Sequence, residues 1–160
     1  MAVDMFLKIE TIEGESRDKT HGKEIDVLAW SWGASNSGTA HLGGGAGAGK
    51  VNIQDLSVTK YVDKASTELF AACCAGKHFT KATLTVRKAG TTPLEYIIIE
   101  MEEVLINSLS TGGSGGEDRL TENISLNFAK VTFKYTPQKA DGSADKTLTQ
   151  VWDIAANVNE

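Results

Sequence analysis

The chain contains little cysteine. Two of its 160 residues are cysteine, and they are neighbours, Cys73 and Cys74. Adjacent cysteines rarely bridge because the resulting ring is strained, and two thiols cannot build a disulfide framework. A chain of this length can bury a stable core without such staples. The sequence therefore predicts a fold held together by its core, in a compartment where thiols stay reduced.

The chain also lacks a long apolar stretch. The apolar run at residues 96–99 ends at Glu100, and no segment approaches the ~18 continuous apolar residues of a membrane-spanning helix. Residues 1–5 lack the basic start and apolar stretch of a secretory signal. We therefore expect a protein without a membrane span that is made and folded in the cytoplasm. If it leaves the cell, it leaves by a route that recognises the folded molecule.

An excess of basic residues is missing as well. Sixteen Lys and Arg stand against 21 Asp and Glu, which gives a net charge of −5 and a pI near 5.2. A nucleic-acid binder needs a basic face to displace counterions from phosphates, so this balance argues against that class. The hydrophobic fraction of 41% and the charged fraction of 23% are ordinary for a globular protein. We expect one domain over residues 1–160.

What the sequence does contain is apolar alternation with a period of two, which is typical of half-buried strands. On the segment 25–33, Leu28, Trp30 and Trp32 share the face expected to meet the core, and Ala29 and Ser31 share the opposite face. Strands are predicted over residues 5–11, 25–33, 51–62, 82–88, 95–109 and 120–135, followed by an apolar tail with Leu148, Val151 and Trp152.

The alternation slips by one residue in two of these strands, near Gln54-Asp55 and near Ala129-Lys130. Such a slip predicts a β-bulge, and bulges bend strands so that a sheet can close or a strand can pass between two sheets. Residues 12–24 and 34–50 show no periodicity and predict loops. The second is long and rich in glycine, so we expect it to project from the domain.

One segment changes period. Leu69, Ala72, Cys73 and Gly76 fall at i, i+3, i+4 and i+7, which predicts a helix within residues 63–76 that ends with Gly76 at C′. About seven strands and one helix predict a mainly β fold. The natural architecture is an antiparallel barrel, closed or nearly closed, with one flanking α-helix.

The glycine-rich loop contains a match to a phosphate-binding motif. Residues 44–50 fit G-x-x-x-x-G-K, in which backbone amides cradle phosphates and the lysine reaches them. The motif also needs Ser or Thr next, where Val51 stands, and a helix next, where a strand pattern follows. These two departures argue against a nucleotide hydrolase.

Other chemistry is equally incomplete. Cys73, Cys74 and His78 are close in sequence, but a structural zinc site needs four ligands, and His21 and His41 stand alone in polar loops. The acidic residues of the segment 95–109 are more typical of a solvated strand face than of a catalytic pair (Glu100, Glu102 and Glu103). We therefore predict no enzyme, no cofactor and no metal. Trp30 and Trp32 favour core packing, and a carbohydrate-binding β-barrel module stays the alternative.

Residues 110–123 are unusual. Glycines and serines lead into Glu117, Asp118 and Arg119 and then into a long amphipathic segment. Glycines permit close backbone approach and positive φ, so this stretch predicts a joint with a polar contact. It closely resembles the Hcp family, the haemolysin-coregulated proteins of bacterial type VI secretion systems. Further similar segments follow in order along essentially the whole chain: residues 14–16, His21 with 24–33, 49–51, 56–61, 76–78 and 135–142.

The resemblance implies a two-sheet β-barrel with one helix, like a phage tail-tube subunit. It implies a homohexameric ring with a wide channel and stacking of rings into the inner tube of a contractile machine. Implied partners are further copies of the chain, the sheath and spike proteins, and effector proteins that the channel carries and protects. The resemblance also implies secretion to the extracellular space without a signal peptide.

Three sets of residues are candidates for these contacts. We expect the loop 34–50 to reach the neighbouring ring, because such a loop gains order only through a partner. Ser31, on a small and mildly polar strand face, is the candidate for contact with cargo. The joint predicts a contact between subunits through Glu117, Asp118 and Arg119. The residues of the predicted ring-stacking loop are Gly43, Gly44, Gly45, Gly47, Gly49 and Lys50.

Overall fold

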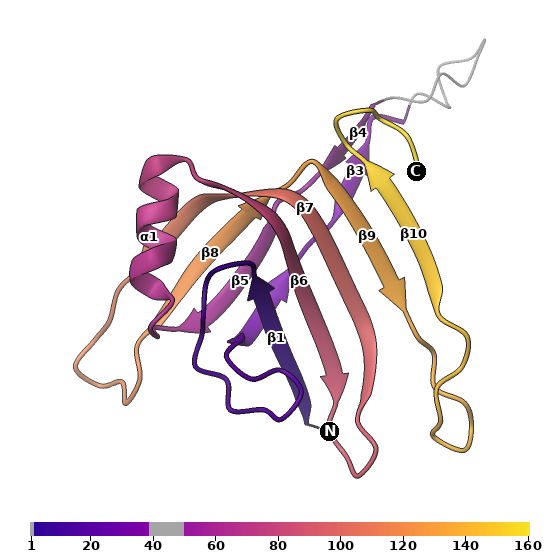
Figure 1. The fold of residues 1–160 in the computed structure, drawn as a ribbon, viewed down its shortest axis with the longest axis horizontal. Coiled ribbons are helices and arrows are strands. Elements are labelled where there is room, and N and C mark those ends of the chain that lie inside the picture. The colour runs from indigo at the N-terminus through magenta and orange to yellow at the C-terminus, as the bar shows by residue number, and fades with distance from the viewer. Residues whose placement is uncertain (1, 39–49) are drawn as a thin grey trace.

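A computed structural model describes residues 2–38 and 50–160 (Figure 1). Strands dominate it, and each follows from apolar alternation in the sequence. The elements in chain order are β1 (Val3–Ile9), β2 (Ile25–Ser31), β3 (Ala34–Asn36), β4 (Val51–Ile53), β5 (Leu56–Tyr61), α1 (Ser66–Ala75), β6 (His78–Lys88), β7 (Leu94–Thr111), β8 (Thr121–Asn127), β9 (Lys130–Tyr135) and β10 (Leu148–Asp153).

The main sheet closes into a barrel because β7 is long enough to serve two neighbours. Its strand order is β10-β9-β7-β6-β1-β2-β5-β8, with a further pairing between β7 and β8, and all these pairings are antiparallel. The second part of β7 pairs with β8 and its first part with β9. Six strands therefore form the closed barrel, and β9 and β10 continue the sheet beyond it. This confirms the predicted mainly β barrel.

The barrel core consists of the inward side chains of these strands. Leu7, Leu56, Leu84, Ile99 and Leu126 have no solvent exposure. Burying one such side chain stabilises the fold by about 1.5–3 kcal/mol. The core thus has the aliphatic, alternating character that the sequence predicts.

The two predicted bulges turn out to be strand breaks. At Gln54-Asp55, β4 ends as a partner of β3 and β5 begins as a partner of β2 and β8. At Phe128-Ala129, the chain leaves the second part of β7 and joins its first part. Each slip marks a change of partner, so the predicted positions were right and the predicted bulges were wrong.

A real irregularity lies in β2, where the register with β5 shifts between Val27 and Ala29. Ile25 and Val27 are buried before the shift, and Trp30 and Trp32 pack against the core after it. Leu28 stands at the shift and is 39% exposed. The prediction that Leu28 faces the core was therefore wrong, because the irregularity turns it outward.

The predicted loop 34–50 is partly strand. Residues 34–36 form β3, which pairs with β4 as a two-stranded sheet. This pair extends from the barrel at the end where β10 finishes (Figure 1). Of the proposed stacking residues, Lys50 is described and exposed, and Gly43, Gly44, Gly45, Gly47 and Gly49 lie outside the described residues.

The helix α1 confirms the prediction for residues 63–76. Leu69 and Ala72 are buried, Cys73 is half-buried, and the helix packs against β7. Gly76 ends the helix at φ +62°, where its N–H group bonds the Cys73 carbonyl. Positive φ is costly for other residues, which explains the glycine at this position.

Candidate functional site

One face of the barrel carries small uncharged polar side chains. It is formed by the outward residues of β2, β5, β8 and the second part of β7. Cross-strand pairing aligns one serine from each of these strands in a single row: Ser31, Ser57, Ser125 and Ser108. Three of the four are exposed, and Ser125 is half-buried. We call this surface the serine face.

A second row lies beside the first. It contains Ala29, Thr59, Asn123 and Ser110, again one residue from each strand. The Thr59 hydroxyl donates a 2.6 Å hydrogen bond to the Asn123 side chain. The Ser108 and Ser125 hydroxyls are 2.5 Å apart, and Ser125 also donates to Asn107. These bonds tie neighbouring side chains of the serine face to one another.

Neither row contains a charged residue. The acidic residue at the margin, Asp55, accepts hydrogen bonds from the amides of Asn107 and Asn127 at 2.5 and 2.8 Å. The hydroxyls and the amide of these two rows can donate and accept weak hydrogen bonds, but the rows offer no nucleophile-base pair and no fixed charge. The serine face is suited to contact with another macromolecule. Its sequence signal was Ser31 alone, because only pairing brings the other serines into the row.

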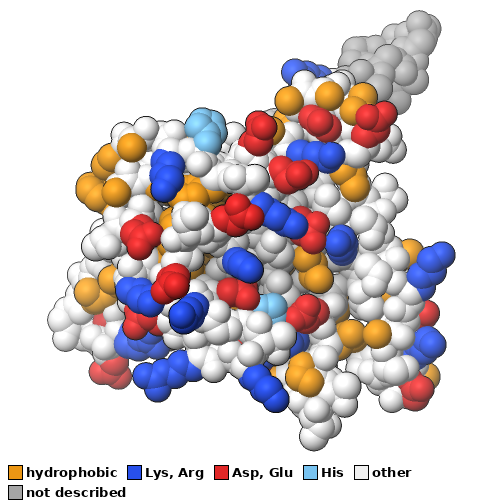
Figure 2. Space-filling view, in the orientation of Figure 1, with side chains coloured by type: hydrophobic (Ala, Val, Ile, Leu, Met, Phe, Trp, Pro, Cys, Tyr) orange, Lys and Arg blue, Asp and Glu red, His pale blue; other side chains and the backbone are white. Residues whose placement is uncertain are grey.

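The face shown in Figure 2 is different, because Lys and Arg are interspersed there with Asp and Glu. Register places Lys81, Glu102, Lys130 and Asp153 opposite one another across β6, β7, β9 and β10. Alternating signs across neighbouring strands favour pairing. Glu100 adds a 3.2 Å ion pair with Lys134. The glutamates 100 and 102 thus each face a lysine of β9, which agrees with a solvated strand face.

The predicted joint lies at one end of the serine face. Arg119 stacks over the ring of Tyr61, with 3.7 Å between the guanidinium carbon and the ring centroid. Glu117 and Asp118 are exposed and make no ion pair with the described residues. Arg119 is therefore held by its own chain, and the two carboxylates project outward.

The sequence led us to expect an isolated His21, and this expectation was wrong. Its ring is buried and stacks on Phe6 at 4.6 Å between centroids. Nδ1 lies 2.8 Å from Glu24 Oε2, and Nε2 lies 2.5 Å from Glu95 Oε1. Burial opposes the charged form, but hydrogen bonds to Glu95 and Glu24 outweigh it and raise the pKa of His21. The histidine ties the loop 12–24 to the start of β7.

The other residues considered for metal binding or catalysis do not lie together in one site. Cys73 is half-buried on α1, Cys74 is exposed, and His78 is exposed at the start of β6. Within residues 2–38 and 50–160, no three His, Cys, Asp or Glu side chains are grouped as metal ligands would be. Trp30 and Trp32 pack against the core, and Trp32 stacks on Phe133 with centroids 5.8 Å apart. This packing does not favour the carbohydrate-binding alternative.

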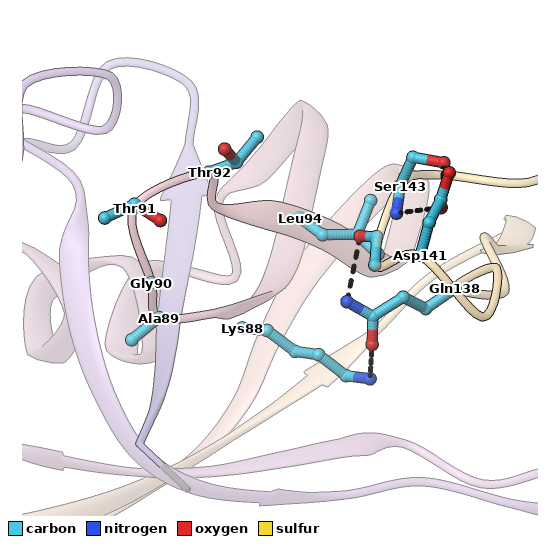
Figure 3. A pocket seen from close by; sticks show the side chains of 10 residues that line it. Lys88, Ala89, Gly90, Thr91, Thr92, Leu94, Gln138, Asp141 and Ser143 are labelled. Carbon is cyan, nitrogen blue, oxygen red and sulfur yellow. Dashed lines mark hydrogen bonds between the residues drawn. The ribbon is translucent and has the colours of Figure 1, made fainter.

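A cleft of about 430 Å³ separates two loops (Figure 3). One is the turn between β6 and β7, and the other joins β9 to β10. Lys88 donates a 3.2 Å hydrogen bond to Gln138, which donates in turn to the Gly142 carbonyl at 2.9 Å. Hydrogen bonds from the Ser143 hydroxyl and N–H lower the pKa of Asp141. The Lys88–Gln138 bond links the end of β6 to the loop between β9 and β10, and the other bonds lie within that loop. None of these contacts is a reactive pair.

None of the described helices is both long enough and apolar enough to cross a membrane.

Comparison with known proteins gives a consistent result. The model of the family described as type VI secretion system effector, Hcp, matches residues 6–135. Protein hcp1 of Pseudomonas aeruginosa is 62% identical over 160 residues, covering 99% of each chain. A solved structure of a type six secretion system protein has a TM-score of 0.94 at 32% identity, covering 99% of this chain and 100% of that one. Hcp1 of Salmonella typhimurium has a TM-score of 0.80 at 34% identity, covering both chains fully.

Proposed function

The chain belongs to the Hcp family of type VI secretion system effectors, and we propose that it forms hexameric rings whose channel is lined by the serine face. Family membership makes it a structural, secreted component of the secretion system. The ring, its stacking and its cargo go beyond that membership. The observation that carries the proposal is the four-strand row of serines.

A channel that passes many different cargo proteins needs a wall that selects weakly. Charged side chains attract or repel a cargo according to its own charge, and a large apolar surface holds it too tightly. The serine face avoids both, because its two rows contain hydroxyls, an amide and one alanine. The small side chains also leave the channel wide. The charged face of Figure 2 then lies on the outside, where the sheath surrounds the tube.

Ring closure uses two different surfaces of each copy, because every subunit meets one neighbour on each side. Rings that stack head to tail likewise need two different ends. The chain has them: the β3–β4 pair lies at one end, and the β6–β7 turn lies at the other (Figure 1). The proposed stacking role of residues 34–50 agrees with the place of β3 and β4. The outward carboxylates of Glu117 and Asp118 remain candidates for a polar contact between subunits.

Ser31→Gln tests the channel wall. The longer side chain rises above the row and obstructs bound cargo, so we expect cargo recovered with affinity-purified rings to fall about tenfold, the change that ~1.4 kcal/mol produces. Recovery is measured by quantitative mass spectrometry of proteins retained by tagged rings from secreting cells. Thr83→Gln on the opposite, charged face of the sheet is the matched control and should retain cargo.

Particle size is measured on the same samples. Rings of unchanged size with reduced cargo support the proposal. Full cargo recovery with Ser31→Gln, or loss of the rings themselves, would contradict the placement of this residue in the channel.

A further inference from the structure

A single carboxylate stands at the margin of the serine face. Asp55 directly precedes β5, in which Leu56 and Val58 are buried, so alternation turns Asp55 to the same outward side as Ser57 and Thr59. The two rows of the serine face beside it contain no charged side chain. Asp55 is therefore the point along this strand where a negative charge joins the uncharged surface.

Neutral groups hold this carboxylate in place. The Asn107 amide donates to Asp55 Oδ2 at 2.5 Å, and the Asn127 amide donates to Oδ1 at 2.8 Å. Asn107 stands at the register shift between β7 and β8, and such irregularities re-aim a side chain. Its own oxygen accepts a hydrogen bond from Ser125, a member of the serine row. Asp55 is thus built into the hydrogen-bond network of the serine face without a positive partner.

The carboxylate of Asp55 still has room for a further partner. A carboxylate offers about four acceptor positions, two on each oxygen. The two amide bonds use one position on each oxygen, and Asp55 makes no ion pair with any residue that the structure describes. One free position on each oxygen suits the paired donors of an arginine, and a lysine ammonium can use either.

The two ends of the serine face differ in their charge. β5 runs from the β3–β4 end toward the loop between β7 and β8 (Figure 1). In that loop Arg119 follows Glu117 and Asp118, so both signs occur there. At the β3–β4 end, Asp55 has two neutral amides as partners. Lys50 is separated from it by the whole of β4. The uncompensated charge therefore lies at the β3–β4 end.

Resting on the channel proposed above, we infer that Asp55 selects cargo segments rich in arginine or lysine. Each copy in the ring places one such carboxylate at the same level of the channel wall, and charges of one sign that line a confined space reinforce one another. The serine rows beyond this level hold cargo weakly and without regard to its charge. Discrimination by charge then occurs at one end of the channel, next to β3 and β4.

Asp55→Asn tests this inference, because it removes the charge and keeps the size of the side chain. The probes are two fluorescent peptides of equal length, one alternating arginine with glycine and the other glutamate with glycine. Fluorescence anisotropy at low salt measures their dissociation constants from rings of the full chain. We expect unmodified rings to prefer the arginine peptide, and Asp55→Asn to weaken its binding about tenfold, the combined effect of a few exposed ion pairs.

Three further variants show whether the charge itself is responsible. Glu102→Gln removes the same charge from the opposite, charged face, where Glu102 is exposed, and should leave the binding of the arginine peptide unchanged. Asp55→Glu keeps the charge and should retain the preference. Ser57→Lys adds a positive charge beside Asp55 without touching its hydrogen bonds, and should abolish the preference even if Asp55→Asn disturbs the fold. Particle size and melting temperature are measured for every variant.

The outcomes separate this inference from the proposed function. Unmodified rings that bind both peptides equally, or Asp55→Asn rings that bind the arginine peptide as tightly as Glu102→Gln rings, overturn selection by Asp55 and leave the ring and its channel intact. Absence of rings in the unmodified protein overturns the proposed function itself.

Discussion

Lys60 is a charged residue in an apolar position. Its side chain has no solvent exposure, and its ammonium group bonds the carboxylate of Glu122, which is itself 2% exposed. Asp63 lies 3.0 Å and Ser66 3.3 Å from the same nitrogen. Ser66 also donates a 2.6 Å bond to Glu122. This network fastens the start of α1 to β5 and β8, and so it fixes the helix relative to the barrel.

Lys60→Met should be strongly destabilising. The substitution leaves the Glu122 carboxylate buried without its partner, and breaking a buried pair in this way costs about 3–5 kcal/mol. The double variant Lys60→Met, Glu122→Leu should recover part of that loss, because it removes the unpaired carboxylate at position 122 and leaves only that of Asp63. Chemical denaturation at fixed protein concentration measures both values.

The control for this pair is Lys134→Met, which removes a partly exposed ion pair with Glu100 and should cost less than about 1 kcal/mol. A Lys60→Met protein as stable as the Lys134→Met protein would show that the buried network does not hold the helix.

The sequence contains a signal for this network. Lys60 follows Leu56 and Val58 in alternation, and Glu122 precedes Ile124 and Leu126 in the same way. Each charged residue therefore falls on the apolar phase of its strand. Two such residues of opposite sign predict a buried pair, although only the pairing of β5 with β8 shows that Lys60 and Glu122 are directly opposite.

At the scale of elements, the loop 12–24 is held against the barrel by charge. His21 lies between Glu24 and Glu95, and Arg87 donates hydrogen bonds to Asp18 and to Asp4, both at its Nη atoms. The guanidinium of Arg87 holds the pKa of Asp18 well below its ordinary value. Because both ring nitrogens of His21 face carboxylates, only the imidazolium form donates to both.

Within the same loop, the backbone at Gly14 lies very close to the backbone at Glu24. A Cβ atom on Gly14 would lie 2.4 Å from the Glu24 carbonyl oxygen, so glycine is required there for a reason of space. The sequence predicts the loop correctly from its lack of periodicity. It does not predict the histidine contact, because Glu95 is 74 residues away along the chain.

His21→Gln should lower stability in a pH-dependent way. The folded pKa of His21 is raised, so its contribution is complete below the unfolded value of about 6.5 and is lost as pH rises through the folded pKa. We expect the variant to be about 1.5–3 kcal/mol less stable at pH 6, the range for hydrogen bonds to charged groups, and the difference to shrink by pH 9. Thermal unfolding at matched protein concentration gives this difference.

His78→Gln, at an exposed histidine outside this contact, is the matched control and should be as stable as the unmodified protein. A His21→Gln deficit that is equally large at pH 6 and pH 9 would mean that the imidazolium does not stabilise the loop.

For the whole molecule, the barrel and its helix follow from the sequence, but the strand pairing that closes the barrel does not. Alternation locates the strands, and the period change ending at Gly76 locates α1. The slips near Gln54-Asp55 and Ala129-Lys130 mark changes of strand partner, which alternation cannot distinguish from bulges because both shift the phase by one residue. The division of β7 between β8 and β9 is a long-range pairing with no local sequence signal.

The sequence likewise predicts only part of the candidate site. Ser31 could be predicted from its small neighbour on β2. The row that it forms with Ser57, Ser108 and Ser125 is visible only from the register of four strands. The molecule therefore has an uncharged polar face and a charged face. This difference between the two faces is what the proposed channel wall requires.

The most direct test of the account is negative-stain imaging of the purified full-length chain, with its mass in solution measured by light scattering on the same sample. We predict ring-shaped particles of a single diameter with a central opening and a mass equal to six chains. A strict monomer at high protein concentration would contradict the account.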